Sequence, residues 1–262
     1  MLQNVPGVTS RFDTRPEFAD VVHVIIDNSR SLNALNSDLM SQFVAVVNAL
    51  HADQKMRAIV VTGAGEKAFI GGADIHELSQ LANPTAARAF ITRVHECCRC
   101  LRDLPVPVIA RVNGYALGAG LELAAACDMR VASSNAVFGM PEVKFGMPSV
   151  VEAALLPGLI GWGRTRRLLL LGDTIDAAEA LQWGLVEKVV APEALDAAVD
   201  SWLRLMATNG NRGMRLQKRL IRDWETLPID QAVSTGIATF SETFETGEAR
   251  QMLRSFIDRP RG

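Results

Sequence analysis

Residues 116–127 read A-L-G-A-G-L-E-L-A-A-A-C, a glycine-rich turn that runs into an apolar, helix-forming segment. Glu122 is the only polar side chain in this stretch. An ionised carboxylate in apolar surroundings is costly to desolvate unless it is paired, hydrogen-bonded or facing a polar cavity. Glu122 is therefore either one half of a buried ion pair or a catalytic acid or base.

The segments on either side of this stretch alternate between strand and helix patterns. Ser37 or Asp38 is expected to cap a helix that runs to about His51, and a second helix is expected between Ala86 and Leu104. The stretch from 63 to 74 is expected to be a loop. Strands are predicted at 20–27, 58–63, 105–114, 129–133 and 136–141. From Val150 onward the pattern is mostly helical, with one short strand at 185–190, so we expect an α/β core with a helical C-terminal extension.

Length, composition and charge limit the size of the core, the expected partners and the expected location of the protein. A chain of 262 residues that is 48% hydrophobic can bury one large core, or a core with a small appendage. The formal net charge of -2 gives no overall field that would attract nucleic acid or an anionic membrane, so neither is an expected partner. The N-terminus shows no targeting pattern, and Glu122, Asp128 and Arg130 interrupt the long apolar stretches. We therefore expect a cytoplasmic protein.

Three of the four cysteines crowd into H-E-C-C-R-C at 95–100, which raises the question of a metal site. Zinc sites usually combine two well-separated Cys pairs, and here there is one tight group on an expected helix. We expect Cys97, Cys98 and Leu101 to pack one face of that helix, and we expect no metal.

A second glycine-rich segment resembles a nucleotide-binding turn. Gly63, Gly65 and Ala68 match G-x-G-x-x-A after a predicted strand. A dinucleotide-binding turn must open directly into a helix, whereas Gly71 and Gly72 stand where the helix interior should be. The sequence also contains no G-K-[ST], which excludes a P-loop.

The glycines at 71 and 72 and those at 118 and 120 invite a joint interpretation. Each pair lets the backbone approach a ligand closely and point N–H groups outward. Two such N–H groups from separate loops would form an oxyanion hole, which a helix N-terminus would reinforce. Tight turns and close helix packing are the alternative explanation for any single glycine.

Three long blocks carry a resemblance to a known family. They are V-T-G-A-G-E-K-A-F-I-G-G-A-D-I at 61–75, P-V-I-A-R-V-N-G-Y-A-L-G-A-G-L-E-L-A-A-A-C-D at 107–128 and F-G-M-P-E-V-K-F-G-M-P at 138–148. Together with matching segments at 33–40, 172–190 and 240–250, they resemble the enoyl-CoA hydratase/isomerase (crotonase) superfamily over nearly the whole chain.

The resemblance implies an architecture and a ligand. It implies an α/β fold in which residues 1–200 form a spiral of repeated ββα units that carries the CoA and catalytic site. Residues 201–262 would form a helical region used in trimerisation, giving a homotrimer or a hexamer built as a dimer of trimers. The substrate would be an acyl-CoA thioester, with coenzyme A as part of the substrate and no permanently bound cofactor.

The resemblance also implies roles for individual residues. The backbone N–H groups of Ala73 and Ala119 would hold the thioester oxyanion. Glu122 would deprotonate a water at the β-carbon and Glu142 would protonate the α-carbon, as hydration requires. Their proximity should push their pKa values apart or upward. Further contacts with substrate or CoA are expected from Gly72, Asp74, Ile75, Gly118 and Lys218.

Several positions depart from the family pattern or leave alternatives open. Hydratases commonly continue to P-G-x-G-G after the second glutamate, whereas this chain places Val150 and Val151 there. Glu152 is expected to be a helix-start residue rather than a third acid. His76 is either a CoA contact or exposed.

A basic stretch in the C-terminal helical region would hold CoA phosphates or form a solvated helix face, and it comprises Arg212, Arg215, Lys218, Arg219 and Arg222. Apolar residues that would line a subunit interface or the core are Leu216, Leu220, Ile237, Phe240, Phe244 and Phe256.

The sequence thus predicts a 2-enoyl-CoA hydratase, because both glutamates are present. An isomerase or another crotonase-type acyl-CoA lyase or hydrolase is the alternative on the same scaffold, since an isomerase typically needs one carboxylate. A non-catalytic binding protein of this fold is a third possibility, and the intact acids and glycine turns argue against it. The acyl chain length and the pathway are not predicted.

Overall fold

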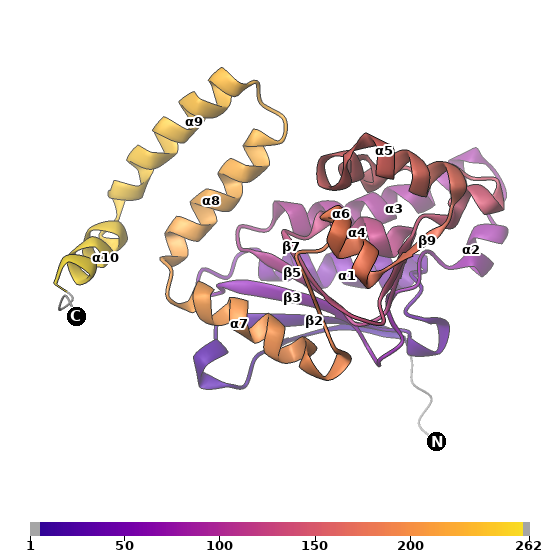
Figure 1. The fold of residues 1–262 in the computed structure, drawn as a ribbon, viewed down its shortest axis with the longest axis horizontal. Helices are drawn as coiled ribbons and strands as arrows, with labels where there is room; N and C mark the ends of the chain where they lie inside the picture. Colours follow the sequence, from indigo (N-terminus) through magenta and orange to yellow (C-terminus); the bar gives the residue numbers. More distant parts are fainter. Residues whose placement is uncertain (1–5, 259–262) are drawn as a thin grey trace.

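The computed structural model describes residues 6–258, and its strands form two sheets (Figure 1). The larger sheet has the order β1-β2-β3-β5-β7-β10, with β1 antiparallel to β2 and the other pairs parallel. Its strands are β1 (Gly7–Phe12), β2 (Val21–Asp27), β3 (Ala58–Gly63), β5 (Val108–Val112), β7 (Met129–Ser133) and β10 (Lys188–Val190). The smaller sheet has the order β4-β6-β8-β9. Its strands are β4 (Ala68–Ile70), β6 (Tyr115–Leu117), β8 (Val137–Gly139) and β9 (Thr174–Asp176).

From β3 to β8 the chain contributes strands alternately to the larger and the smaller sheet. After β3, β5 and β7 the chain adds β4, β6 and β8 to the smaller sheet and then returns through helical segments. These segments are α2 (Ile75–Ser79) and α3 (Pro84–Asp103), then α4 (Ala119–Ala126), then the 3-10 turns η3 (Pro141–Phe145) and η4 (Val151–Leu155) with α5 (Leu156–Leu171). The structure therefore confirms the expected α/β spiral of ββα units.

Helix starts differ from the sequence prediction by one or two residues. Asn36, rather than Ser37 or Asp38, caps α1 (Ser37–Leu50), because its side chain accepts a hydrogen bond from the N–H of Leu39. Asn83 caps α3 in the same way, so that helix begins at Pro84 rather than Ala86.

The sequence pattern missed β4, β6 and β9 of the smaller sheet and β1 of the larger sheet, whereas β8 lies inside the strand predicted at 136–141. Residues 68–70 lie in the segment predicted to be a loop, and β9 lies where a helical pattern was expected. Each strand of the smaller sheet has three residues, too few to show an alternating pattern. Their pairing across the chain, rather than local sequence, defines them.

The core lies on both faces of the larger sheet. On one face, α1, α3 and α4 cover a large apolar cluster that includes the buried Cys97, Cys98 and Leu101, as the helix pattern predicted. On the other face, α7 (Leu195–Ala207) covers a smaller cluster around Phe18, Val60 and Leu203. Burial raises the pKa of the Cys98 thiol. Within residues 6–258 no group of His, Cys, Asp or Glu side chains could hold a metal ion.

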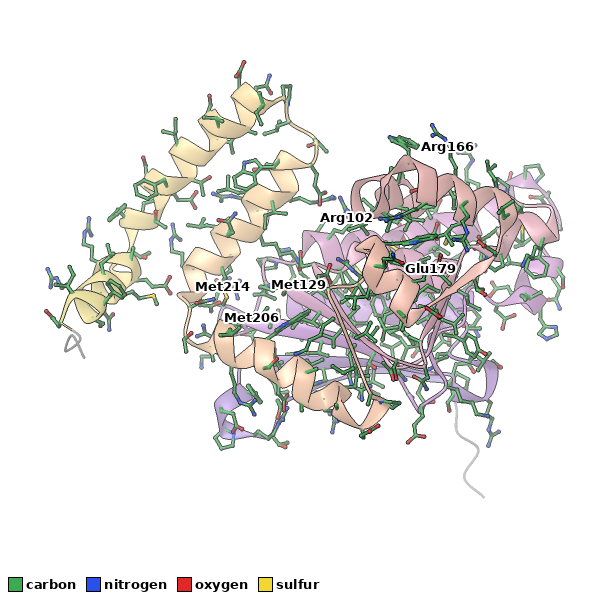
Figure 2. The ribbon with its side chains drawn as sticks, in the orientation of Figure 1. Arg102, Met129, Arg166, Glu179, Met206 and Met214 are labelled. Atoms are coloured by element: carbon green, nitrogen blue, oxygen red, sulfur yellow. The ribbon has the colours of Figure 1, made fainter. Side chains whose placement is uncertain are left out.

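The last helices extend away from the two sheets (Figure 1). They are α8 (Asn211–Trp224), α9 (Ile229–Glu242) and α10 (Glu248–Ile257), which follow α6 (Ala177–Trp183) and α7. The predicted boundary between residues 200 and 201 falls inside α7. Met206 belongs to the smaller apolar cluster, and Met129 and Met214 pack against that cluster (Figure 2). Among the helices of the described chain, none is long and apolar enough to cross a membrane.

Candidate active site

Three parallel strands of the smaller sheet end at one edge. Register pairs join β4 to β6 and β6 to β8, so Ile70, Leu117 and Gly139 lie near one another at the ends of their strands. The backbone then enters the glycine turn before α2, the glycine turn before α4, and η3 with Glu142. The sheet therefore delivers three segments, far apart in sequence, to one place, as expected at the carboxyl ends of parallel strands.

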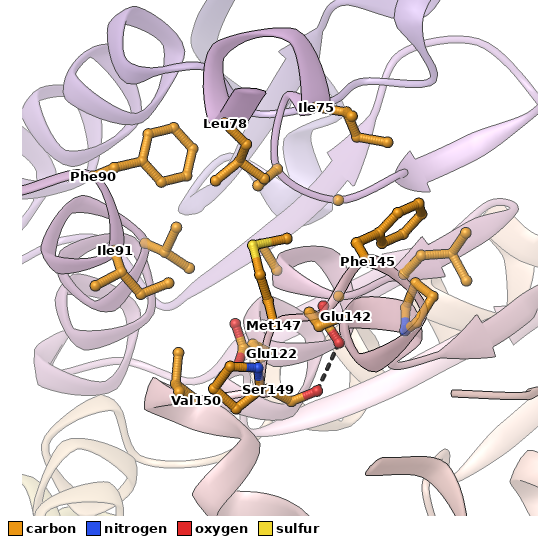
Figure 3. A pocket seen from close by; sticks show the side chains of 18 of the residues that line it. Ile75, Leu78, Phe90, Ile91, Glu122, Glu142, Phe145, Met147, Ser149 and Val150 are labelled. Atoms are coloured by element: carbon orange, nitrogen blue, oxygen red, sulfur yellow. Dashed lines mark hydrogen bonds between the residues drawn. The ribbon is translucent and has the colours of Figure 1, made fainter. Parts of the chain in front are cut away.

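A cavity of about 390 Å³ opens at this edge (Figure 3). Its polar lining includes Glu122, Glu142 and Ser149. Many of its apolar side chains come from α2, α3 and the segment around η3, and these are Ile75, Leu78, Phe90, Ile91, Val94, Phe145, Met147 and Val150. The cavity thus offers an apolar compartment with two carboxyl groups at its wall.

The two glycine turns contact one another at the cavity. Gly72 and Gly118 have φ angles of 121° and 51°, which other residues rarely adopt. A Cβ at Gly72 would lie 3.3 Å from the carbonyl oxygen of Leu117, so the two loops are in contact. Ala73 and Ala119 follow these glycines and both line the cavity.

The backbone N–H groups next to those of Ala73 and Ala119 donate hydrogen bonds within the protein. Asp74 N–H donates to Leu35 and Gly118 N–H donates to Gly139. Across the described residues, the Ala73 and Ala119 N–H groups take part in none of the loop and capping hydrogen bonds. This pattern is what a pair of oxyanion donors requires.

Glu122 is the buried carboxylate of the site. It is 4% exposed, on a helix whose residues are all buried, and it lines the cavity. Its Oε1 accepts a hydrogen bond of 3.1 Å from the N–H of Ala153. In the part of the chain that the structure describes, no Lys or Arg pairs with it, so the buried ion pair is wrong as an explanation of Glu122.

The environment of Glu122 changes its acidity. Burial and, to a smaller extent, the negative charge of Glu142 raise the pKa of Glu122 to about 8, against the lowering effect of the Ala153 hydrogen bond. Desolvation disfavours the charged form, and a nearby carboxylate disfavours it further. The free protein therefore favours a proton on Glu122 at neutral pH.

Glu142 faces the same cavity from η3 (Figure 3). The hydroxyl of Ser149 donates a hydrogen bond of 2.6 Å to its Oε2. Its Oε1 lies against Gly118, where a Cβ would come within 2.3 Å. Gly118 therefore gives its turn the required φ and leaves space for the second carboxylate.

The other predicted contact residues divide into two groups. Gly72, Ile75 and Gly118 line the cavity. Asp74 does not, because its carboxylate caps α2 by accepting the N–H of Glu77 at 2.9 Å. His76 is exposed on the same short helix and is also outside the cavity lining.

Lys218 lies outside the cavity. Its ammonium donates to the carbonyl oxygens of Leu101 at 3.2 Å and Val106 at 2.8 Å, and it pairs with Asp128 at 2.8 Å. The side chain is buried beneath α8, so it is a docking contact between α8 and the core of its own chain. The rest of the basic stretch, Arg212, Arg215, Arg219 and Arg222, also bonds to groups of this chain.

Glu152 lies in the first turn of η4, as expected of a helix-start residue, but its side chain is also buried and hydrogen-bonded. It is 7% exposed, and its Oε1 bonds to Nδ1 of His95 at 2.8 Å. Sequence reasoning assigned no role to His95 or Ser149. The signal at Glu152 was the same as at Glu122, a single carboxylate in the apolar run V-V-E-A-A-L-L.

Comparison with known proteins gives consistent matches over most of the chain. The profile of the family described as "Enoyl-CoA hydratase/isomerase" matches residues 17–261. A "Short-chain-enoyl-CoA hydratase" from Clostridium acetobutylicum is 38% identical over 240 residues, which are 91% of this chain and 92% of that protein. A "Crotonyl-CoA hydratase" from Syntrophomonas wolfei subsp. wolfei is 36% identical over 235 residues, which are 89% and 90% of the two chains.

The fold is also similar to a solved structure. The crystal structure of an enoyl-CoA hydratase from Bacillus anthracis superposes with a TM-score of 0.90 at 29% sequence identity. The superposition covers 96% of each chain.

Proposed function

The chain belongs to the enoyl-CoA hydratase/isomerase family, and we propose that it adds water across the α,β-double bond of an enoyl-CoA thioester. The observation that carries this proposal is that Glu122 and Glu142 line one apolar cavity together with Ala73 and Ala119. Two carboxyl groups supply the proton acceptor and the proton donor that hydration needs.

The reaction can be written with these residues in stated roles. The N–H groups of Ala73 and Ala119 bind the thioester oxygen, which becomes negatively charged as the enolate forms. Glu122 takes a proton from water, whose oxygen bonds to the β-carbon. Glu142 gives a proton to the α-carbon, and the carbon-carbon double bond becomes single. The two carboxyl groups hold the same number of protons before and after, because one is gained and one is lost.

An isomerase is the second candidate on this scaffold. It would move a proton between two carbons with one carboxylate and would need no bound water. The second carboxylate, held by Ser149 at the cavity wall, favours hydration. C–C-bond-cleaving or hydrolytic chemistry has no separate support in the described residues.

Short-chain thioesters are the substrate class we propose. The two relatives named as short-chain and crotonyl-CoA hydratases support this choice. Crotonyl-CoA, hexenoyl-CoA and decenoyl-CoA should be compared by the loss of enoyl-thioester absorbance. We expect the highest kcat/KM for crotonyl-CoA. Isomerisation of 3-enoyl-CoA without hydration of any 2-enoyl-CoA would contradict the proposed reaction.

The pH dependence of the reaction follows from the acidity of Glu122. The reaction needs one proton on this pair of carboxyl groups, because Glu142 must give a proton while Glu122 takes one. Burial with the charge of Glu142 raises the pKa of Glu122 to about 8, so above that pH the pair loses its last proton and has no donor for the α-carbon. We therefore expect kcat/KM to fall as the pH increases through about 8, which a profile between pH 6 and pH 9.5 would measure. A profile that rises across this range would contradict a mechanism that needs one proton on this pair.

Coenzyme A enters as part of the substrate, and we propose no permanently bound cofactor. Because Lys218 is occupied by Asp128 and two carbonyl groups, the phosphates require other partners than Lys218 of the same chain. A cytoplasmic location stays a prediction from the sequence.

We propose that α9 and α10 join copies of this chain into a trimer or a dimer of trimers. These helices leave a row of large apolar side chains exposed, comprising Ile229, Val233, Ile237, Phe240, Leu253, Phe256 and Ile257. A monomer rarely exposes so much contiguous apolar surface. Sedimentation equilibrium should give three or six times 28.4 kDa, and a monomer at micromolar concentration would contradict the proposal.

A further inference from the structure

Glu152 is a buried carboxylate that the proposed reaction does not use. It lies on η4, outside the cavity lining, and His95 of α3 donates to its Oε1 through Nδ1. Its Oε2 is buried and has no hydrogen-bond partner in the described chain. A half-satisfied buried carboxylate is costly, so its position calls for an explanation.

The residue that follows Glu152 contacts Glu122 directly through its backbone. Ala153, the next residue, donates its N–H to Oε1 of Glu122. Val151, the preceding residue, has a φ of 40°, which is strained for a β-branched side chain. Strain of this kind persists only where surrounding contacts hold it, and it often occurs at functional sites. The His95 contact is one such restraint on this turn.

The η4 turn also places the negative charge of Glu152 near Glu122. The ionisable groups that face Glu122 are Glu142 from η3, Glu152 from η4 and the Cys98 thiol from α3. Both neighbouring carboxylates raise the pKa of Glu122. His95 is partly exposed on α3, the helix whose Phe90, Ile91 and Val94 line the cavity.

We propose that His95 and Glu152 act as a positioning pair, which holds the Ala153 amide against Glu122 and keeps a second negative charge beside it. The pair touches neither the substrate nor the water. It sets the orientation and the charge environment of the group that does. This inference rests on the proposed role of Glu122 in hydration.

Glu152→Gln tests the charge of the pair. Glutamine keeps an oxygen that can accept the His95 hydrogen bond, but it removes the charge. We expect the pKa of Glu122 to fall by about half a unit. The infrared band of the protonated Glu122 carboxyl, identified by its loss in Glu122→Gln, gives this pKa without substrate. Glu96→Gln, one residue from His95 on α3, is the matched control and should leave the band unchanged.

His95→Ala and His95→Asn test the positioning. Removing the donor should lower kcat for crotonyl-CoA about tenfold with little change in KM, and asparagine should restore part of kcat because its amide can donate to Glu152. If Glu152→Gln does not fold, the infrared titration of His95→Asn and His95→Ala replaces it. An unchanged pKa of Glu122 in folded Glu152→Gln, or unchanged kcat in His95→Ala, overturns the inference. Because the infrared titration needs no turnover, failure to hydrate any enoyl-CoA would overturn the proposed function alone.

Discussion

Glu122→Gln is expected to lower kcat for the hydration of crotonyl-CoA by about 10²–10⁴, the usual contribution of a general base. Glutamine has nearly the same volume, and its oxygen can still accept the N–H of Ala153. The substrate-binding surface should therefore persist, and KM should change little. Steady-state kinetics measure both constants, with Glu66→Gln on an exposed loop as the control.

Although Glu122→Gln should lose activity, its free energy of unfolding should be higher than that of the wild type at alkaline pH. The folded protein raises the pKa of Glu122 from 4.5 to about 8, so between these values the folded state holds a proton that the unfolded chain has lost. The free energy of unfolding of the wild type therefore decreases as the pH rises through this window. Glutamine removes that penalty, so Glu122→Gln should be more stable than the wild type above about pH 8 and similar to it below about pH 4.5.

Urea unfolding at several pH values measures this difference. Lower stability of Glu122→Gln at pH 9, or full hydratase activity, would contradict our account of Glu122. The combination of lost activity and gained stability is informative because general structural damage lowers both. Glu122 is thus a residue whose burial costs stability and whose chemistry explains its presence.

The sequence was a good guide where the signal was local. Glu122 stood out because an isolated carboxylate in an apolar helix is physically anomalous, and the structure places it at the cavity wall. In the larger sheet, β2, β3, β5 and β7 overlap strands predicted from β-branched runs such as 20–27, whereas β1 was not predicted. Of the three-residue strands, β8 and β10 lie inside predicted strands, whereas β4, β6 and β9 were not visible, because their partners are distant in sequence.

Long-range contacts explain the remaining differences. Glu142 follows a proline in an unremarkable turn, and only its resemblance to a family block indicated a role. Lys218 belonged to a basic stretch that was expected to hold CoA phosphates or to form a solvated helix face. In the structure its charge contacts Asp128 and two backbone carbonyls instead. Glu152 does lie at a helix start, as predicted, but its contact with His95 was missed because that residue is 57 positions away. Charge patterns along a helix do not reveal which charges are already paired.

Glu142→Gln is expected to lower kcat for hydration by about 10²–10⁴ as well, for a different reason. Glutamine cannot deliver a proton to the α-carbon, although its amide oxygen can still accept the hydrogen bond from Ser149. Hydration alone would not separate the two glutamates, since either loss stops the reaction. Exchange of the α-protons of butyryl-CoA in D₂O separates them, because it needs the α-carbon acid and the oxyanion donors but no water at the β-carbon.

We therefore expect Glu142→Gln to abolish this exchange, and Glu122→Gln to retain it within about tenfold. Proton NMR of the thioester follows the exchange directly. Lys144→Gln, on the same 3-10 turn and outside the cavity lining, is the matched control and should exchange like the wild type. Exchange that is lost in Glu122→Gln and kept in Glu142→Gln would reverse the two roles. In that case the raised pKa of Glu122 would belong to the proton donor, and the proton that the free protein favours on Glu122 would be the one given to the α-carbon.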